Sequence, residues 1–117
     1  MGDVVYVGLG EVEAEFFPMR HRLRARVDRL RSLTRSALRD QVVLGTDTTR
    51  TIDRLADDLM SAPAGPSVAY LDQHAPMVER MLERADTPER AALGAGNVAR
   101  VLEGALRAAN GPLIVRW

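Results

Sequence analysis

Apolar residues recur at every third or fourth position over residues 19–39, which is the clearest helical pattern in the chain. They are Met19, Leu23, Val27, Leu30, Leu33 and the pair Ala37 and Leu38. Steps of three and four residues place side chains on one side of a helix. The pattern therefore predicts a helix from Met19 to about Arg39, with Pro18 in its first turn. Its polar positions carry eight arginines.

Two short apolar runs, Val4–Val7 and Val42–Leu44, each end at a glycine. Uninterrupted runs of this kind are typical of strands buried on both faces of a parallel sheet. A helix-containing segment joins them, which predicts a right-handed parallel βαβ unit. We place the two parallel strands at about residues 4–8 and 42–46. Residues 11–17 are expected to form a loop, with a short strand as the alternative.

The remainder of the chain alternates helical patterns with turn residues. A helix capped by Thr49 or Thr51 is predicted to end near Met60, and a loop should cover residues 61–66. Ser67 is expected to begin a helix that Pro76 kinks or splits. These segments belong to one partial domain, residues 1–117. It comprises a strand–helix–strand unit at 1–48, helices at 49–109 and a tail at 110–117.

Two further helices are predicted near the carboxyl end. The sequence Asp86-Thr87-Pro88 combines a capping side chain with a proline suited to a first helical turn, so a helix should start there. Gly94-Ala95-Gly96 should end it. Asn97 should cap a last helix that stops at residues 110–112, and residues 113–117 trail off with an extra strand left open.

Composition narrows the class of protein. The chain has 117 residues, 46% hydrophobic and 27% charged, as in ordinary globular domains. The absence of cysteine excludes disulfides and thiolate metal sites. The formal net charge of zero gives no global attraction to nucleic acid. No apolar run reaches the roughly 20 residues of a membrane span, and the amino end lacks a secretory pattern. We therefore expect a cytoplasmic protein without a membrane partner.

Asp47 is the leading candidate for chemistry. It follows the second predicted strand at its carboxyl end, the edge where α/β proteins gather their sites. A carboxylate there could bind a divalent metal or orient a metal-bound water. The alternative is a helix-capping or turn aspartate, and the residues alone leave both open.

The stretch DQVVLGTDTTR, residues 40–50, resembles the eighth strand of phosphotriesterase-like metal hydrolases, a branch of the amidohydrolase superfamily. In that family an apolar triplet and a small residue precede a metal-binding aspartate. Residues 3–18, DVVYVGLGEVEAEFFP, are similar to the seventh strand and its loop. Residues 70–106 are similar to the family's final helices, including the segment GNVARVL at 96–102.

The resemblance implies a (β/α)8 barrel, of which this chain would be the last βα units followed by C-terminal helices. It implies one or two divalent metals, usually zinc, and a metal-bound hydroxide that attacks a phosphotriester or a lactone. Asp47 would be both metal ligand and catalytic proton shuttle. Gly10, Thr48 and Arg50 would line the substrate pocket.

Several departures qualify this picture. The family's other ligands are histidines and a bridging lysine, but this chain has no lysine. Its two histidines, His21 and His74, fall in predicted helices. One aspartate cannot hold a catalytic zinc, which needs about three protein ligands. We therefore predict an inactive C-terminal fragment, TIM barrel in type, whose partner is a complementary N-terminal barrel fragment or a second copy.

The alternative function is a non-catalytic interaction protein that uses the arginine-rich helix 19–39 or exposed sheet edges. Arginines can grip phosphates, but no aromatic residues interleave them and no nucleic-acid motif is present, so no nucleic-acid partner is expected. A solvated outer helix face is the simpler interpretation. Gly8-Leu9-Gly10 lacks the third glycine of a dinucleotide loop because position 13 is glutamate. Glu11, Glu13 and Glu15 fit a solvated edge.

Overall fold

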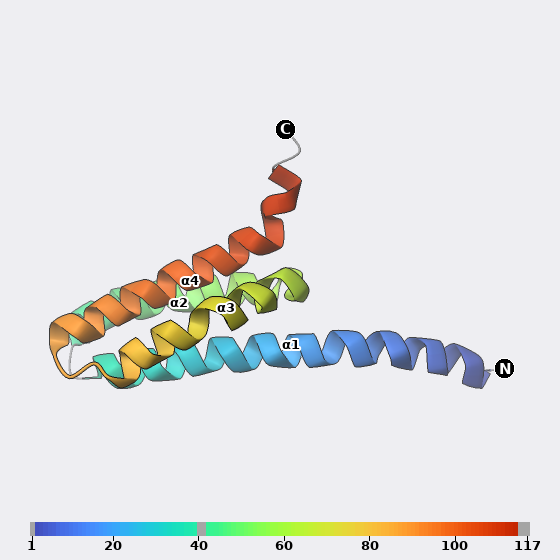
Figure 1. Ribbon diagram of the computed structural model, residues 1–117, viewed down its shortest axis with the longest axis horizontal. Coiled ribbons are helices and arrows are strands. Elements are labelled where there is room, and N and C mark those ends of the chain that lie inside the picture. Colours follow the sequence, from blue (N-terminus) through green and yellow to red (C-terminus); the bar gives the residue numbers. More distant parts are fainter. Residues whose placement is uncertain (1, 40–41, 115–117) are drawn as a thin grey trace.

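The chain folds into a bundle of helices in the computed structural model (Figure 1). The structure describes the backbone of residues 2–39 and 42–114 and the side chains of residues 19–39 and 47–110. The helices are α1 (Gly2–Leu38), α2 (Val42–Met60), α3 (Ala64–Glu83) and α4 (Pro88–Ile114). The molecule is elongated, with principal extents of 61 × 36 × 22 Å.

The predicted α/β fold is wrong, because residues 2–39 and 42–114 contain helices and no strand. The expected parallel strands at residues 4–8 and 42–46 lie in the first turns of α1 and α2. The βα units of a TIM barrel are therefore absent from the described chain. A short apolar run fits a buried strand and a buried helical turn equally well. Gly8 and Gly45, interpreted as strand ends, continue each helix at a cost of about 1 kcal/mol apiece.

The predicted helix over residues 19–39 is confirmed as the second half of α1. Its apolar stripe enters the core, where Leu23, Val27 and Leu30 are at most 1% exposed. The helix starts earlier than expected and includes Pro18. The strand–helix–strand unit proposed for residues 1–48 is thus α1 together with the start of α2.

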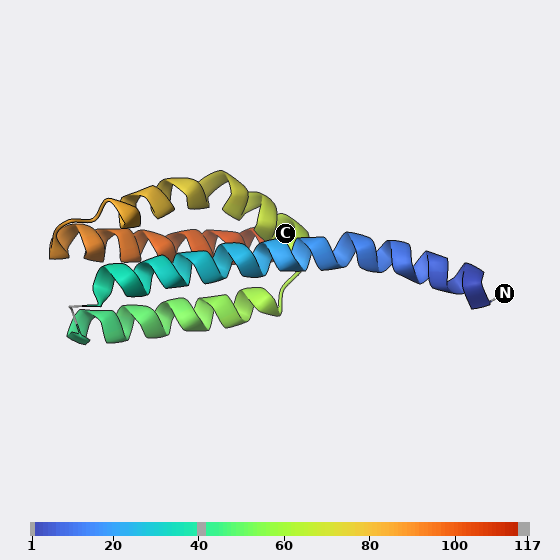
Figure 2. The ribbon, with the colours of Figure 1, turned by 90° about the horizontal axis from the view of Figure 1, so that it is seen from below.

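One hydrophobic core joins all four helices. α1 and α4 each pack against the other three helices, whereas α2 and α3 barely touch. Figure 2 shows the consequence, with α1 flanked by α2 on one side and α3 on the other. The largest fully buried apolar side chains are Leu23, Leu30, Ile52, Leu59, Leu71 and Leu102, with Val27, Val68 and Val98 between them.

The structure differs from the sequence prediction at two expected interruptions, one in α3 and one in α4. α3 runs on through Pro76 and is arched rather than split (Figure 2). α4 begins at Pro88 as predicted, where the Thr87 hydroxyl accepts a hydrogen bond from the Arg90 amide at 3.2 Å. It does not end at Gly94–Gly96 or stop at residues 110–112. Gly94 instead faces Leu82, where a Cβ atom would lie 2.8 Å from Leu82 Cδ2.

Gly104 makes a second close approach between these two helices and yields a prediction. A Cβ atom there would lie 2.1 Å from the Tyr70 hydroxyl, and the Tyr70 ring packs on His74 with centroids 4.2 Å apart. Gly104→Ala should force the ring away and lower the free energy of unfolding by about 1–2 kcal/mol. Urea unfolding would measure this. Adding Tyr70→Ala should remove the penalty, and an unchanged penalty would contradict the packing.

α1 is much longer than the helices beside it. It has 37 residues, against 19 in α2 and 20 in α3. Its first turns consequently project beyond one end of the bundle (Figures 1 and 2). Within the described residues, no helix combines the length and apolar character that crossing a membrane requires.

Candidate functional site

The structure does not gather the residues predicted from the hydrolase resemblance. Asp47 is exposed on α2, and its backbone carbonyl accepts a hydrogen bond from the Thr51 hydroxyl at 3.2 Å. Thr48 and Arg50 lie within a turn of it, half-buried and exposed respectively. Gly10 belongs to the first half of α1. The start of that helix and the start of α2 lie at opposite ends of the molecule (Figure 2).

No metal centre forms around these residues. Among the described residues, no three His, Asp or Glu side chains come together as ligands. His21 lies on α1, and His74 packs on Tyr70 within α3. The zinc site and the catalytic role of Asp47 therefore stay predictions of the resemblance, and the surroundings of Asp47 add no support to them.

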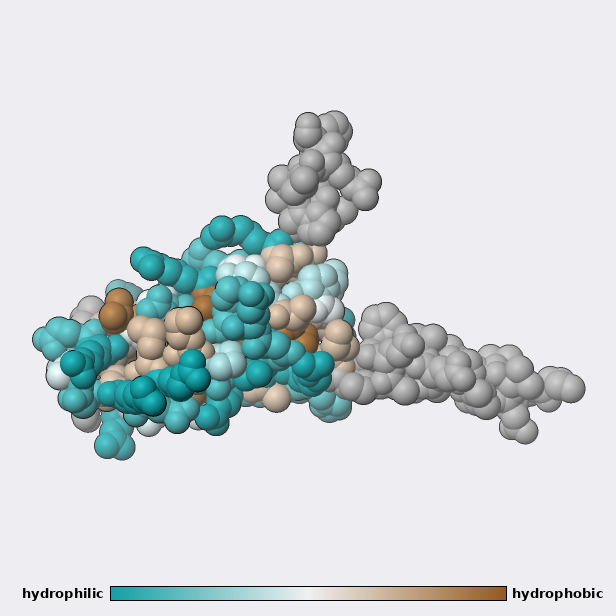
Figure 3. All heavy atoms as spheres, in the orientation of Figure 1, coloured by the Kyte–Doolittle hydropathy of each residue, from teal (hydrophilic) through white to brown (hydrophobic). Residues whose placement is uncertain are grey.

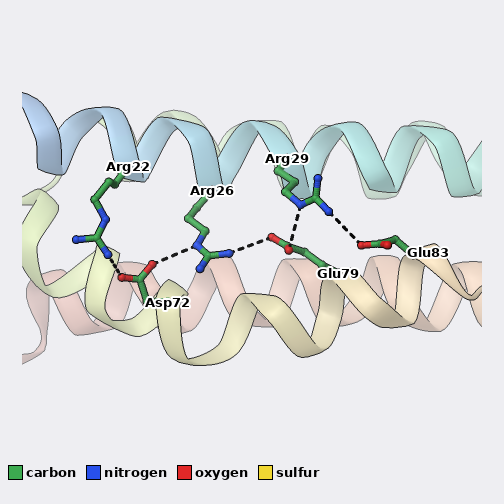
Figure 4. A network of polar contacts seen from close by, with 6 residues as sticks. All are labelled: Arg22, Arg26, Arg29, Asp72, Glu79 and Glu83. Atoms are coloured by element: carbon green, nitrogen blue, oxygen red, sulfur yellow. Dashed lines mark hydrogen bonds and ion pairs between the residues drawn. The ribbon is translucent and has the colours of Figure 1, made fainter.

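Arginines of α1 instead form a charged ladder with acids of α3 (Figure 4). Arg26 Nε donates to Asp72 at 3.1 Å, and Arg29 Nε donates to Glu79 at 3.1 Å. The whole ladder comprises Arg22, Arg26, Arg29, Asp72, Glu79 and Glu83. Arginines on α1 at steps of four and three therefore meet acids on α3 at steps of seven and four. Sequence analysis did not predict this charge match, because the acids lie more than forty positions from the arginines that they meet.

Two more α1 arginines bind α2. Arg31 Nε donates to Asp53 at 2.9 Å, and Arg35 lies 3.6 Å from the same carboxylate. The predicted solvated outer face of α1 is therefore largely engaged within the molecule. These ion pairs fix the registers of α1 against α2 and α3 and leave fewer guanidinium groups for a partner.

A pocket between α1 and the end of α2 holds the arginines that remain. It measures about 210 Å³ and is lined by Arg20, His21, Arg24 and Met60. Arg20 Nη1 donates to the Met60 carbonyl at 3.0 Å, which ties one guanidinium to the last residue of α2. Within the described side chains, no ion pair involves Arg24. An adjoining hollow of about 240 Å³ shares Arg24 and Met60 and adds Asp28 and Asp57 to its lining.

The two arginines make the lining of this pocket suited to an anion. Guanidinium groups are permanently charged donors without acceptors, so they match carboxylate or phosphate oxygens. Among the described residues, every buried side-chain nitrogen and oxygen has a hydrogen-bond partner, so none is left to bind a ligand. Buried Thr34, for example, donates to the Leu30 carbonyl at 2.7 Å. The pocket is thus the best candidate site in the described part of the chain.

No family model, curated protein or solved structure matches this chain. The similarity to phosphotriesterase-like hydrolases therefore stays a prediction from residues 3–18, 40–50 and 70–106.

Proposed function

We propose that the chain is a non-catalytic helical assembly module, which pairs with a second copy of itself through the start of α1. The observation that carries the proposal is the projection of α1 beyond the bundle (Figures 1 and 2). A lone helical segment of this length is marginal in water and needs tertiary packing to persist. A partner helix would supply that packing.

The sequence of the projecting segment suits burial. Residues 2–18 include apolar residues at positions 5, 9, 12 and 16, separated by four, three and four residues. This is the spacing of helix pairs that pack lengthwise. It continues directly into Met19 and Leu23, the stripe that the core of the bundle uses.

Charge favours a second copy as the partner. Residues 2–18 contain Asp3, Glu11, Glu13 and Glu15 and no basic residue. Residues 19–39 contain eight arginines and one acid, Asp28. Two α1 helices lying antiparallel would bring the acidic start of each toward Arg20 and Arg24 of the other, the α1 arginines that have no carboxylate partner among the described residues. Such two-fold pairing is the commonest symmetry of soluble oligomers.

Leu9→Asp tests this proposal. The full chain should sediment as a dimer at micromolar concentrations. Two-fold symmetry places the substitution in the interface twice, so the dissociation constant should rise about a hundredfold or more. Analytical ultracentrifugation over a concentration series measures both values.

Ser32→Asp is the matched control, because Ser32 is an exposed residue on the bundle half of α1. It should leave the dimer intact. A chain that stays monomeric at all concentrations, or equal effects of the two substitutions, would refute the proposal. Zinc-dependent turnover of a phosphotriester or lactone that Asp47→Ala abolishes would instead favour the hydrolase lineage.

A further inference from the structure

The arginines of α1 divide into two groups by their contacts. Arg22, Arg26 and Arg29 pair with acids of α3, and Arg31 and Arg35 pair with Asp53 of α2. Arg20 and Arg24 have no carboxylate partner among the described residues. Both line the pocket at the end of α2, next to the base of the projecting segment. This pocket therefore differs from the ladder, because its two guanidinium groups have no ion-paired carboxylate to balance their charge.

We infer that this pocket binds the phosphate group of a small phosphorylated molecule. Arg20 and Arg24 are four residues apart on a helix, so their Cβ atoms lie about 5–6 Å apart on the same side. The bond from Arg20 to the Met60 carbonyl occupies one nitrogen and holds the group at the rim, leaving its other N–H groups to donate. Arg24 is exposed and reaches the same hollow.

Phosphate suits this arrangement better than a carboxylate. A single guanidinium fork satisfies a carboxylate, which has one charge and two oxygens. A phosphate monoester carries nearly two charges on three oxygens and can accept from both arginines. Met60 adds an apolar thioether wall that can contact the organic part of an ester. The volume of about 210 Å³ accommodates a phosphate with a few further heavy atoms.

The neighbouring acids set the direction of binding. Asp28 and Asp57 line the adjoining hollow with Arg24, and Asp28 lies 3.8 Å from Arg31. Their negative charge disfavours an anion at that side of Arg24. The phosphate is therefore placed toward Arg20 and His21, at the end of α2.

The test is a titration of the isotopically labelled full chain, followed by amide chemical shifts, at constant ionic strength set with chloride. Inorganic phosphate and phenyl phosphate should shift amides near residues 20–24 and 60–62, and phenyl phosphate should bind more tightly. Arg24→Gln and Arg20→Gln should each raise the dissociation constant about tenfold, as expected for a lost charge-assisted hydrogen bond. Thermal melts check that both variants fold.

Arg100→Gln is the matched control, because Arg100 is an exposed arginine on α4. It should leave the affinity unchanged. Equal weakening by this control, shifts spread over the whole surface, or acetate binding as tightly as phosphate would overturn the inference. Repeating the titration in Leu9→Asp separates this site from self-assembly, since the phosphate affinity should survive that substitution.

Discussion

Leu102→Ala should lower the free energy of unfolding by about 2–5 kcal/mol, the range for truncating a buried leucine. Leu102 is 0% exposed and belongs to the core that joins all four helices. Its removal leaves a cavity that neighbours on other helices cannot fill without shifting. Urea unfolding followed by circular dichroism gives the change directly.

Leu93→Ala is the control on the same helix. Leu93 is 61% exposed, so its truncation should change the free energy of unfolding by less than about 0.5 kcal/mol. Losses of the same size at both positions would mean that α4 presents a different face to the bundle. The contrast therefore tests the rotation of α4 about its axis. Figure 3 shows the face of the bundle as mostly hydrophilic, with smaller hydrophobic areas between the polar residues.

Glu79→Ala is expected to lower the free energy of unfolding by about 1.5–3 kcal/mol, the range for hydrogen bonds to charged groups. Glu79 is only 7% exposed, yet it accepts from Arg26 at 3.4 Å and from Arg29 at 3.1 Å. Without it, the centre of the ladder loses the carboxylate that both guanidinium groups share. Chemical unfolding at low and high salt measures the effect, which should shrink as salt screens the exposed arginines.

Glu103 provides the comparison for an ordinary surface pair. It lies 3.5 Å from Arg107 one turn along the same helix, and both side chains are exposed. Such pairs contribute about 0.3–0.5 kcal/mol, so Glu103→Ala should be close to neutral. If Glu79→Ala were equally mild, the ladder would not fix the register between α1 and α3.

Periodicity predicted those helices in which apolar residues recur at every third or fourth position over several turns. Leu23, Val27 and Leu30 were identified as one face and are buried together. The start of α4 was also predictable, because Thr87 and Pro88 carry local capping chemistry. In these segments, local sequence and tertiary packing favour the same structure.

The strand predictions were wrong because the local sequence signals there are ambiguous. A four-residue apolar run such as Val4–Val7 has no period to distinguish helix from strand, and its flanking glycine suggested an end. The prediction that a helix ends at Gly94 was wrong for a related reason. It was interpreted as a helix stop, but its lack of a side chain serves the close contact with Leu82 across α3 and α4. Only the packing partner explains that glycine.

The candidate site was predictable in part. The arginine-rich face of residues 19–39 is visible in the sequence. Which of these arginines form ion pairs depends on which acids of α2 and α3 lie beside them. Asp72 and Glu79 have no sequence motif that links them to Arg26, more than forty positions away. The pocket also needs Met60, whose carbonyl meets Arg20 only because α2 ends there.

The weak contact between α2 and α3 has a consequence for the connectivity of the helices. These helices are consecutive, yet the strongest packing runs within α3–α4 and between α1 and α3. The peptide link at residues 61–63 thus joins two antiparallel hairpins, α1–α2 and α3–α4, which pack lengthwise with α1 against α3 and α2 against α4. After proteolytic cleavage at that link, the two hairpins should stay associated through the core and the charged ladder, although no covalent bond would join them.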